Sequence, residues 1–207
     1  MTKNLDQPYI DQIFERNVPG ITNILLKKTI GIAGLGGLGS NIAVSLVRSG
    51  VGRLLVADYD RVEPSNLNRQ FYFLEDIGKK KTEALSVYLK KINPGLILET
   101  NWIKLSRSNV CDVFKKADLL IEAFDKAEEK AWLIEAWSEC FPKKPIIVAS
   151  GLAGYGKTEM LKIERSGNLY ICGDGMSESI MGLNAARIAI VANMQANMAI
   201  ELLVNNE

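Results

Sequence analysis

The chain has 207 residues, of which 47% are hydrophobic and 24% charged, and its formal net charge is +1. These values predict a soluble globular protein of one domain, and the near-neutral charge gives no reason to expect nucleic acid as a partner. No apolar run approaches the roughly 18 residues of a membrane span, and the polar N-terminus is unlike a signal peptide. The chain has no histidine, which excludes Ser-His-Asp and Cys-His mechanisms and metal sites built on imidazole.

The three cysteines, Cys111, Cys140 and Cys172, are widely spaced and odd in number. Such usage is typical of a reducing cytosol and not of a disulfide framework. We therefore expect free thiols and a cytoplasmic location.

The first predicted strand, Thr29–Ala33, runs directly into the glycine-rich sequence Gly34-Leu-Gly-Gly-Leu-Gly39, and a helical periodicity over Asn41–Arg48 follows. Strand, glycine loop and helix in this order are the context in which backbone amides bind phosphate at a helix N-terminus. A tight strand–helix turn without any ligand is the alternative. The candidate phosphate-binding residues are Gly34, Gly36, Gly37 and Gly39.

A crowded polar stretch follows the second predicted strand, Arg53–Ala57. Asp58 ends this strand, where a dinucleotide-binding fold places the acid that holds a ribose; a capping or solvent-facing aspartate is the alternative. An oxidoreductase needs that acid but not the polar run around it, so the run favours phosphate chemistry over redox chemistry. The candidate nucleotide-binding residues here are Asp58, Asp60, Ser65, Asn66, Asn68, Arg69 and Gln70.

Two further positions are candidates for handling phosphate. A lysine triplet, 79–81, opens the next predicted helix, and we select only Lys81 because such a triplet usually marks a solvated helix start. Asp125 and Lys126 follow the fourth predicted strand, where a carboxylate can hold Mg²⁺ against phosphate oxygens. The alternative is that Asp125 only caps the helix that begins at Lys126.

The remaining elements continue the alternation of strands and helices. They are helices over 80–92, 108–116, 126–140 and 183–204, strands over 96–105, 118–123, 145–150, 159–164 and 169–172, and a glycine-rich loop over 173–182. We therefore predict an α/β fold: a doubly wound, Rossmann-like, mostly parallel sheet with a short antiparallel extension and a long C-terminal helix. One domain would cover residues 1–207, with an N-terminal helical segment at 1–27 and the strands and crossover-type loop at 157–182.

These motifs together resemble the adenylation domain of ubiquitin-activating-type enzymes, whose bacterial members include MoeB and ThiF. The matching sequences are Gly-x-Gly-Gly-Leu-Gly-Ser at 34–40, Asp-x-Asp-x-Val-x-x-Ser-Asn-Leu-x-Arg-Gln at 58–70, Gly-x-x-Lys at 78–81 and the aspartate at 125. The resemblance covers the chain from about Lys28 to Leu203. The compact length and the segments 14–20 and 122–127 are most similar to short ThiF-type members, the sulfur carrier protein adenylyltransferases of thiamine thiazole synthesis.

The resemblance implies the cofactors ATP and Mg²⁺ and a role for each matching residue. Asp58 would hold the ribose, Arg69 and Lys81 the phosphates, and Asp125 the magnesium. Family members also place an N-terminal arginine in the partner subunit's active site, which implies a homodimer. Arg16 is the only arginine before the glycine loop and is the candidate for that role.

The cysteines depart from the family pattern. Many members carry two Cys-x-x-Cys pairs for structural zinc, and this chain has none, so we predict no zinc. Some members bind the activated carrier through a cysteine of the crossover loop. Cys172 lies nearest to that region, and we interpret it as a structural cysteine, with covalent carrier attachment as the alternative.

The implied reaction is ATP-dependent adenylylation of the C-terminal Gly-Gly carboxylate of a small ThiS-like carrier, with release of pyrophosphate and with sulfur supplied by a separate protein. An α-carboxyl group has a pKa of about 3.5, so its attack on the α-phosphorus needs no general base, which fits a chain without histidine. The alternatives are MoeB-like activation of a molybdopterin carrier, an NAD(P)-dependent oxidoreductase, a tRNA-modifying dehydratase and a non-enzymatic docking subunit.

Overall fold

The computed structural model describes residues 12–205, whose centre is one sheet of seven strands in the order β3-β2-β1-β4-β5-β7-β6. Neighbouring strands are parallel except β6 and β7, which are antiparallel. The sheet confirms the predicted doubly wound α/β fold with its short antiparallel extension. The strands are β1 Thr29–Ala33, β2 Arg53–Ala57, β3 Ile97–Asn101, β4 Leu119–Glu122, β5 Ile146–Ala149, β6 Lys162–Ser166 and β7 Leu169–Gly173.

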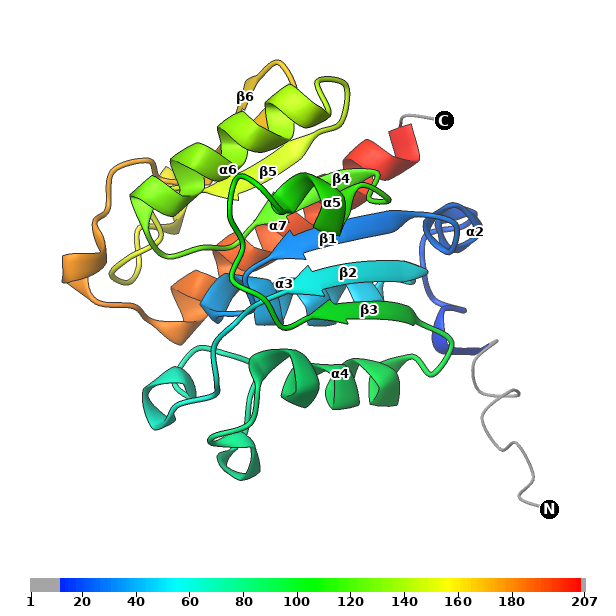
Figure 1. Ribbon diagram of the computed structural model, residues 1–207, viewed down its shortest axis with the longest axis horizontal. Helices are drawn as coiled ribbons and strands as arrows, with labels where there is room; N and C mark the ends of the chain where they lie inside the picture. Colours follow the sequence, from blue (N-terminus) through cyan, green and yellow to red (C-terminus); the bar gives the residue numbers. More distant parts are fainter. Residues whose placement is uncertain (1–11, 206–207) are drawn as a thin grey trace.

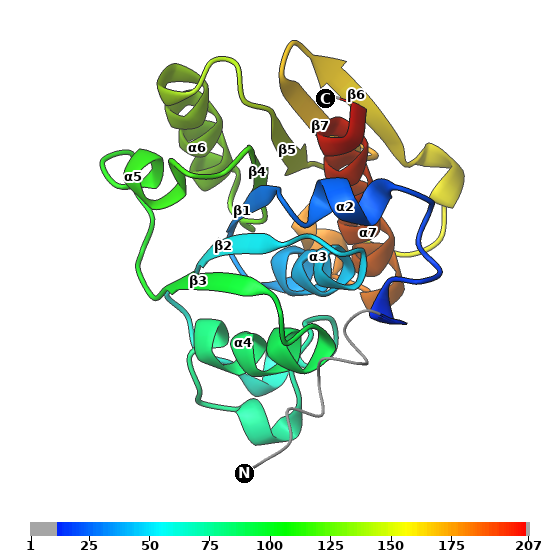
Figure 2. The ribbon, with the colours of Figure 1, turned by 90° about the vertical axis from the view of Figure 1, so that its right-hand side faces the viewer.

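Helices cover both faces of this sheet (Figures 1 and 2). One layer of core lies between the sheet and α3, α4 and α7, and a second lies between the sheet and α5 and α6. Because both faces are covered, β1, β4 and β5 are buried along their whole length. The helices are α2 Ile21–Leu25, α3 Gly37–Arg48, α4 Lys81–Ile92, α5 Val110–Phe114, α6 Ala127–Cys140 and α7 Ala185–Asn205, and the short 3₁₀ turns are η1 Pro64–Asn66, η2 Leu74–Asp76, η3 Thr158–Met160 and η4 Ser179–Met181.

Most elements lie within about two residues of their predicted bounds, and three boundaries differ by more. α3 begins at Gly37 and not near Asn41, because tertiary contacts hold its glycine-rich first turn in spite of the low helix propensity of glycine. β3 ends at Asn101 and not at Leu105, since Trp102 turns aside and its indole N–H donates to the carbonyl of Tyr59 at 3.0 Å. β6 runs later than predicted because a tight turn at Gly167 sets its antiparallel register with β7.

α7 is the longest described helix, and by length and composition it is apolar enough to cross a membrane. Half of its most apolar window is nevertheless buried inside the domain. Ile188, Val191 and Ala199 are buried in the layer that α7 forms with α3. These contacts are those of a core helix, which is what its apolar face predicts. The predicted N-terminal segment at 1–27 lies partly outside the described residues.

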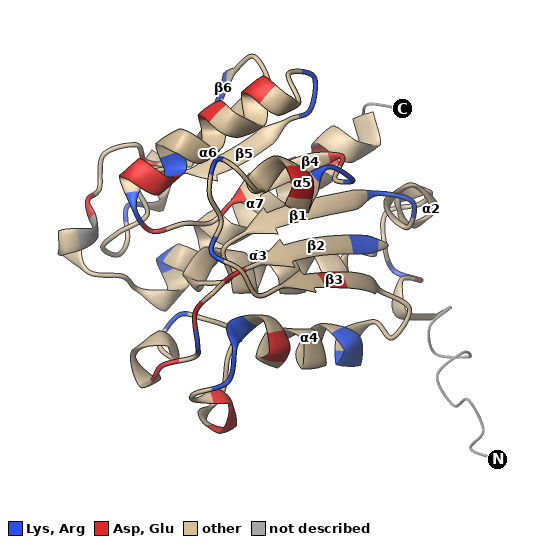
Figure 3. Cartoon of the chain, in the orientation of Figure 1, with Lys and Arg blue, Asp and Glu red and all other residues tan. Residues whose placement is uncertain are grey.

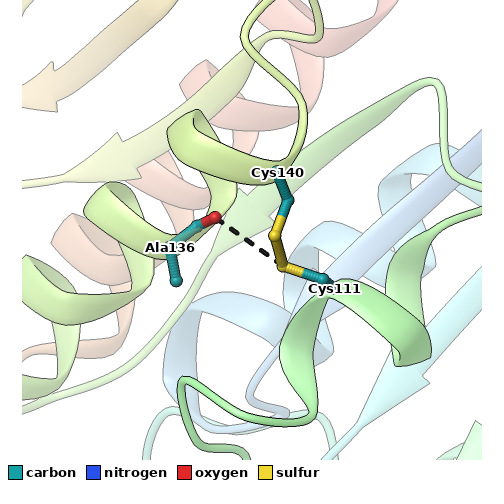
Figure 4. The surroundings of a disulfide bond; sticks show 3 residues. All are labelled: Cys111, Ala136 and Cys140. Atoms are coloured by element: carbon teal, nitrogen blue, oxygen red, sulfur yellow. Dashed lines mark hydrogen bonds between the residues drawn. A yellow bond between two sulfur atoms is a disulfide. The ribbon is translucent and has the colours of Figure 1, made fainter.

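Cys111 and Cys140 form a disulfide between α5 and the last turn of α6 (Figure 4). The expectation of free thiols is therefore wrong for this pair. The two cysteines are 29 residues apart in sequence, but α5 and α6 pack on the same face of the sheet and bring their Cα atoms to 6.3 Å. That distance depends on helix packing, which cysteine spacing alone does not reveal.

Candidate functional site

A cavity of about 680 Å³ lies at the carboxyl ends of β1, β2, β4 and β5. This is the edge at which doubly wound sheets bind ligands, and the volume is within the roughly 300–1,000 Å³ usual for small-molecule sites. Most of the predicted site residues line it: Gly34, Gly36, Gly37, Asp58, Asp60, Arg69, Gln70, Lys81, Asp125 and Lys126. Residues distant in the sequence thus converge on one cavity.

The glycine loop connects β1 to α3 on one side of this cavity. Gly34 has a φ of +95°, which favours glycine, and a Cβ there would lie 2.9 Å from the carbonyl oxygen of Ala123. A Cβ on Gly39 would lie 1.9 Å from the carbonyl oxygen of Gly34. The glycines therefore allow the loop, α3 and β4 to approach closely. The first amides of α3 lack helical partners and are suited to bind an anion at this point.

Asp58 is buried at the end of β2, and both of its carboxylate oxygens accept backbone hydrogen bonds. Its Oδ2 accepts from the amide of Leu35 at 2.6 Å, and its Oδ1 accepts from the amide of Asp60 at 2.7 Å. Burial raises the pKa of Asp58 above its usual value, while the Lys81 ammonium and the two amides oppose that rise. A carboxylate has about four acceptor positions, so Asp58 can still accept from ribose hydroxyls.

Arg69, near the end of the polar stretch, and Lys81, the first residue of α4, supply cationic groups. The Lys81 ammonium is buried and lies 2.9 Å from the Asp60 carboxylate. Arg69 donates through its Nη1 to the carbonyl of Ser65 and to the side chain of Asn68. Gln70 is buried at the cavity wall, and its Oε1 accepts no hydrogen bond within residues 12–205. These groups are available to polar atoms of a ligand.

The cavity carries charges of both signs. Six carboxylates and five cationic side chains line it, and Figure 3 shows both signs together where α6 begins. Such a wall does not by itself neutralise a highly charged anion such as a triphosphate. The carboxylates are Asp58, Asp60, Asp125, Glu128, Glu129 and Glu178, and the cations are Arg69, Lys81, Lys104, Lys126 and Lys130.

Asp125 is exposed on the loop between β4 and α6. The residue at the N-cap position of α6 is Lys126, and no side chain caps this helix. The structure thus contradicts the alternative in which Asp125 is only a helix cap. In the described part of the chain the Asp125 carboxylate makes no hydrogen bond or ion pair, and it lies at the cavity. It is therefore free to contact a cation or ligand.

Some predicted site residues lie outside the cavity wall. Asn66 has a structural contact, because its side-chain oxygen accepts from the amide of Glu63 at 3.1 Å and closes the η1 turn. Arg16 is exposed, and the neighbouring Asn17 donates to the carbonyl of Ser49, at the end of α3 remote from the glycine loop. Arg16 therefore does not contact the cavity of its own subunit. The other predicted residues outside the wall are Gly39, Ser65 and Asn68.

Several supporting residues were not found from the sequence. The Ser40 hydroxyl accepts from the amide of Phe71, and the Asn41 amide group donates to the carbonyl of Arg69 at 3.0 Å. The Tyr72 hydroxyl donates to the carbonyl of Leu35 at 2.9 Å. These bonds hold residues 69–72 against the glycine loop and the first turns of α3. The motif spacing alone gives no sign of them, although Ser40 belongs to the matched motif.

Two loops border the cavity beside β5 and β7, at 150–157 and 174–184. A buried ion pair joins them at the base: Arg187 Nη2 lies 2.5 Å from Asp174 Oδ2, and Arg187 Nη1 donates to the carbonyl of Gly156. The loops also expose large apolar side chains: Tyr155, Met176, Ile180 and Met181 are 84%, 71%, 89% and 60% exposed. Exposed apolar groups gathered beside a polar cavity are typical of a surface that contacts another molecule.

Cys172, by contrast, lies inside β7 and is fully buried. Burial raises the pKa of its thiol to about 12. Since the thiolate is the nucleophilic form, this environment makes Cys172 unreactive near neutral pH. The structural interpretation of this cysteine is supported.

A family model described as the ThiF family matches residues 12–207. The chain belongs to the ThiF family. It is 28% identical over 198 residues to "Adenylyltransferase and sulfurtransferase MOCS3" of Anopheles gambiae, covering 88% of this chain and 43% of that protein. It is 33% identical over 124 residues to the "Sulfur carrier protein adenylyltransferase" of Thermus thermophilus, covering 59% of this chain and 46% of that protein. The chain thus spans less than half the length of these curated relatives.

Solved structures share the fold of this ThiF-family chain over nearly its whole length. Escherichia coli tRNA N6-threonylcarbamoyladenosine dehydratase, TcdA, superposes with a TM-score of 0.86 at 17% identity, covering 97% of this chain and 95% of that one. The same protein in complex with ATP gives a TM-score of 0.86 at 18% identity. At such identities the likeness establishes the fold, which agrees with the Rossmann-like prediction.

Proposed function

We propose that this ThiF-family protein adenylylates the C-terminal carboxylate of a small ubiquitin-like sulfur carrier with a Gly-Gly tail, using ATP and releasing pyrophosphate. The observation that carries the proposal is the convergence of the glycine loop, Asp58, Arg69, Lys81 and Asp125 on one cavity. Two relatives named as adenylyltransferases and a TcdA structure in complex with ATP support a nucleotide in that cavity.

The residues at the cavity, together with a divalent cation, fit the roles that such a reaction requires. The glycine loop would bind phosphate through amides, and Asp58 would hold the ribose. An oxygen of the carrier carboxylate attacks the α-phosphorus, a P–O bond forms, and the bond to pyrophosphate breaks. Arg69 and Lys81 would stabilise the charge on the leaving pyrophosphate. No proton is transferred from the nucleophile, so the step needs no histidine.

The charge distribution also fits Mg²⁺. The wall carries more carboxylates than cationic groups, so a triphosphate needs an additional cation to bind there. Asp125 has an unengaged carboxylate at the cavity and would hold the ion, since magnesium takes few protein carboxylates and keeps several waters. Bound Mg²⁺ would neutralise phosphate oxygens. Within residues 12–205 no group of three or more His, Cys, Asp or Glu side chains is placed to hold a metal ion, so the proposed site depends on Asp125 together with the nucleotide phosphates.

A protein substrate is supported by the loops at 150–157 and 174–184. Their exposed apolar side chains offer a contact surface, and their glycines allow an extended tail to approach the backbone. We further propose thiamine thiazole synthesis as the pathway, a separate sulfur donor and a homodimer. We also propose a cytoplasmic location, although the Cys111–Cys140 disulfide removes the argument for it from free thiols. In a homodimer Arg16 could reach the cavity of the partner subunit.

ATP–pyrophosphate exchange with Mg²⁺, measured with and without a purified ThiS-like carrier, tests the proposal. We expect exchange that depends on the carrier. Exchange with a molybdopterin carrier only would redirect the proposal to that pathway. Absence of exchange with every Gly-Gly carrier, in a protein that binds ATP, would refute the carrier reaction.

The second candidate is activation of a carboxylate on a tRNA nucleoside. It is favoured by a basic aromatic surface beside the cavity, in which Lys80 lies 4.2 Å above the ring of Trp102 and Lys104 lies 5.5 Å from the ring centre of Tyr59. Exposed aromatic rings among cations can stack on nucleic-acid bases. Exchange or ATP hydrolysis stimulated by bulk tRNA and lost in Trp102→Ala would favour this candidate over the carrier.

A further inference from the structure

A buried ion pair closes the segment that carries Asp125. Glu122 is the last residue of β4 and is fully buried. Both of its carboxylate oxygens lie 2.9 Å from the ammonium of Lys130, which is at the fourth position of α6. Oε1 of Glu122 also accepts from the amide of Phe124 at 2.5 Å. The pair therefore joins the end of the strand to the start of the helix across residues 123–129.

Both ends of this segment are attached to the core. The Gln195 side chain of α7 donates to the carbonyl of Glu122 at 3.0 Å, and the amide of Ala123 donates to the carbonyl of Ala33 in β1. Lys130 fixes the first turn of α6 through Glu122. Between these attachments only Phe124, Asp125 and Lys126 form the loop at the cavity. The Glu122–Lys130 pair is thus a side-chain contact that links the two ends of this loop.

The pair is poorly explained as a device for stability. Removing two charged groups from water is costly, and well-packed apolar side chains of similar volume often serve a buried position equally well. Burial raises the pKa of Glu122, and the Lys130 ammonium and the Phe124 amide oppose that rise. The two charges are thus retained at a strand end where an apolar residue would be easier to bury. Because the pair encloses Asp125 in the sequence, a role in placing the loop at the cavity explains it better than stability does.

We propose that Glu122 and Lys130 are positioning residues that hold the 123–129 segment so that Asp125 and Lys126 face the cavity. The pair would set the affinity for nucleotide bound with a divalent cation, and to this extent the inference rests on the proposed function. Glu122 is fully buried and is not part of the cavity wall, whereas Lys130 lies at the wall with its ammonium held by Glu122. Lys130 holds Glu122, and Glu122 fixes the loop amide at Phe124.

Glu122→Gln and Lys130→Gln test this inference, with Glu135→Gln as the matched control. Glu135 also lies on α6 and pairs with a cation, Arg107, but that pair is exposed. We expect each test variant to weaken binding of ATP with Mg²⁺ about 10-fold, the size usual for groups that orient a metal-binding residue, and to weaken binding without Mg²⁺ less. Lys130→Arg should restore most of the affinity, since a guanidinium can still pair with Glu122.

Hydrogen exchange supplies a measurement that does not depend on ATP. Amides of 123–129 should exchange faster in Glu122→Gln and Lys130→Gln than in the wild type, and Glu135→Gln should leave them unchanged. Unchanged exchange in that segment in folded variants would overturn the inference. So would equal losses of affinity with and without Mg²⁺. If the wild-type protein binds no ATP, the proposed function fails, and the exchange rates alone decide whether the pair holds the segment.

Discussion

Arg187 and Asp174 form an ion pair whose removal should strongly destabilise the domain, because both side chains are buried. Both side chains are about 95% buried, and the Asp174 carboxylate also accepts from the amides of Met176 and Ser177 at 2.8 Å. Arg187→Met would leave that carboxylate buried without its counter-ion. Breaking such a pair costs about 3–5 kcal/mol, and we expect about 3 kcal/mol because the two amides remain.

The assay is thermal unfolding followed by circular dichroism at neutral pH. A loss of about 3 kcal/mol corresponds to a fall in Tm of roughly 6–12 °C for a domain of this size. Arg107→Gln, which breaks an exposed pair, is the control and should cost about 1 kcal/mol or less. A loss below about 1 kcal/mol in Arg187→Met would show that removing the counter-ion of Asp174 does not destabilise the domain as expected.

The same pair predicts a dependence on acid. Burial by itself raises the pKa of Asp174, but the amides of Ser177 and Met176 and the Arg187 guanidinium outweigh it and lower the pKa from 3.8 to about 2. A lowered pKa stabilises the folded state above pH 4, by about 2 kcal/mol, and that contribution is lost as the pH falls through 2. The difference in free energy of unfolding between wild type and Arg187→Met should therefore shrink from pH 5 to pH 2. A difference that stays constant would contradict this assignment.

Three further outcomes are expected. Asp125→Ala should abolish Mg²⁺-dependent pyrophosphate exchange yet change the free energy of unfolding by less than about 0.5 kcal/mol, because its exposed carboxylate has no partner in residues 12–205; a lowered Tm would contradict this. Cys172 should resist an alkylating agent at pH 7.5 until the protein is unfolded, since burial raises its pKa to about 12; labelling of native protein, read by mass spectrometry, would refute it. Reduction of Cys111–Cys140 should lower the free energy of unfolding in urea by about 3–4 kcal/mol, from the loop of 29 residues that it closes; an unchanged urea midpoint would exclude that disulfide.

The element order and most residues of the cavity wall could be predicted from the amino-acid sequence. β1 and β2 have their predicted bounds, and the glycine loop, Asp58 and Asp125 lie where the strand–loop–helix order placed them. These predictions succeed because they depend on local properties. Apolar runs define buried parallel strands, glycines define the close turn, and the carboxyl ends of parallel strands share one edge of a sheet.

The pairing of the polar side chains could not be predicted, because it depends on how the elements pack. Cys111 meets Cys140, Lys130 reaches back to Glu122, and Arg187 reaches Asp174, in each case because packed helices and loops set distances that spacing does not encode. Other tertiary contacts explain the boundaries that moved, as at the end of β3, where the Trp102 indole N–H donates to the carbonyl of Tyr59. Periodicity reports which face of an element is buried, whereas a buried charge or thiol finds its partner only after the elements have packed.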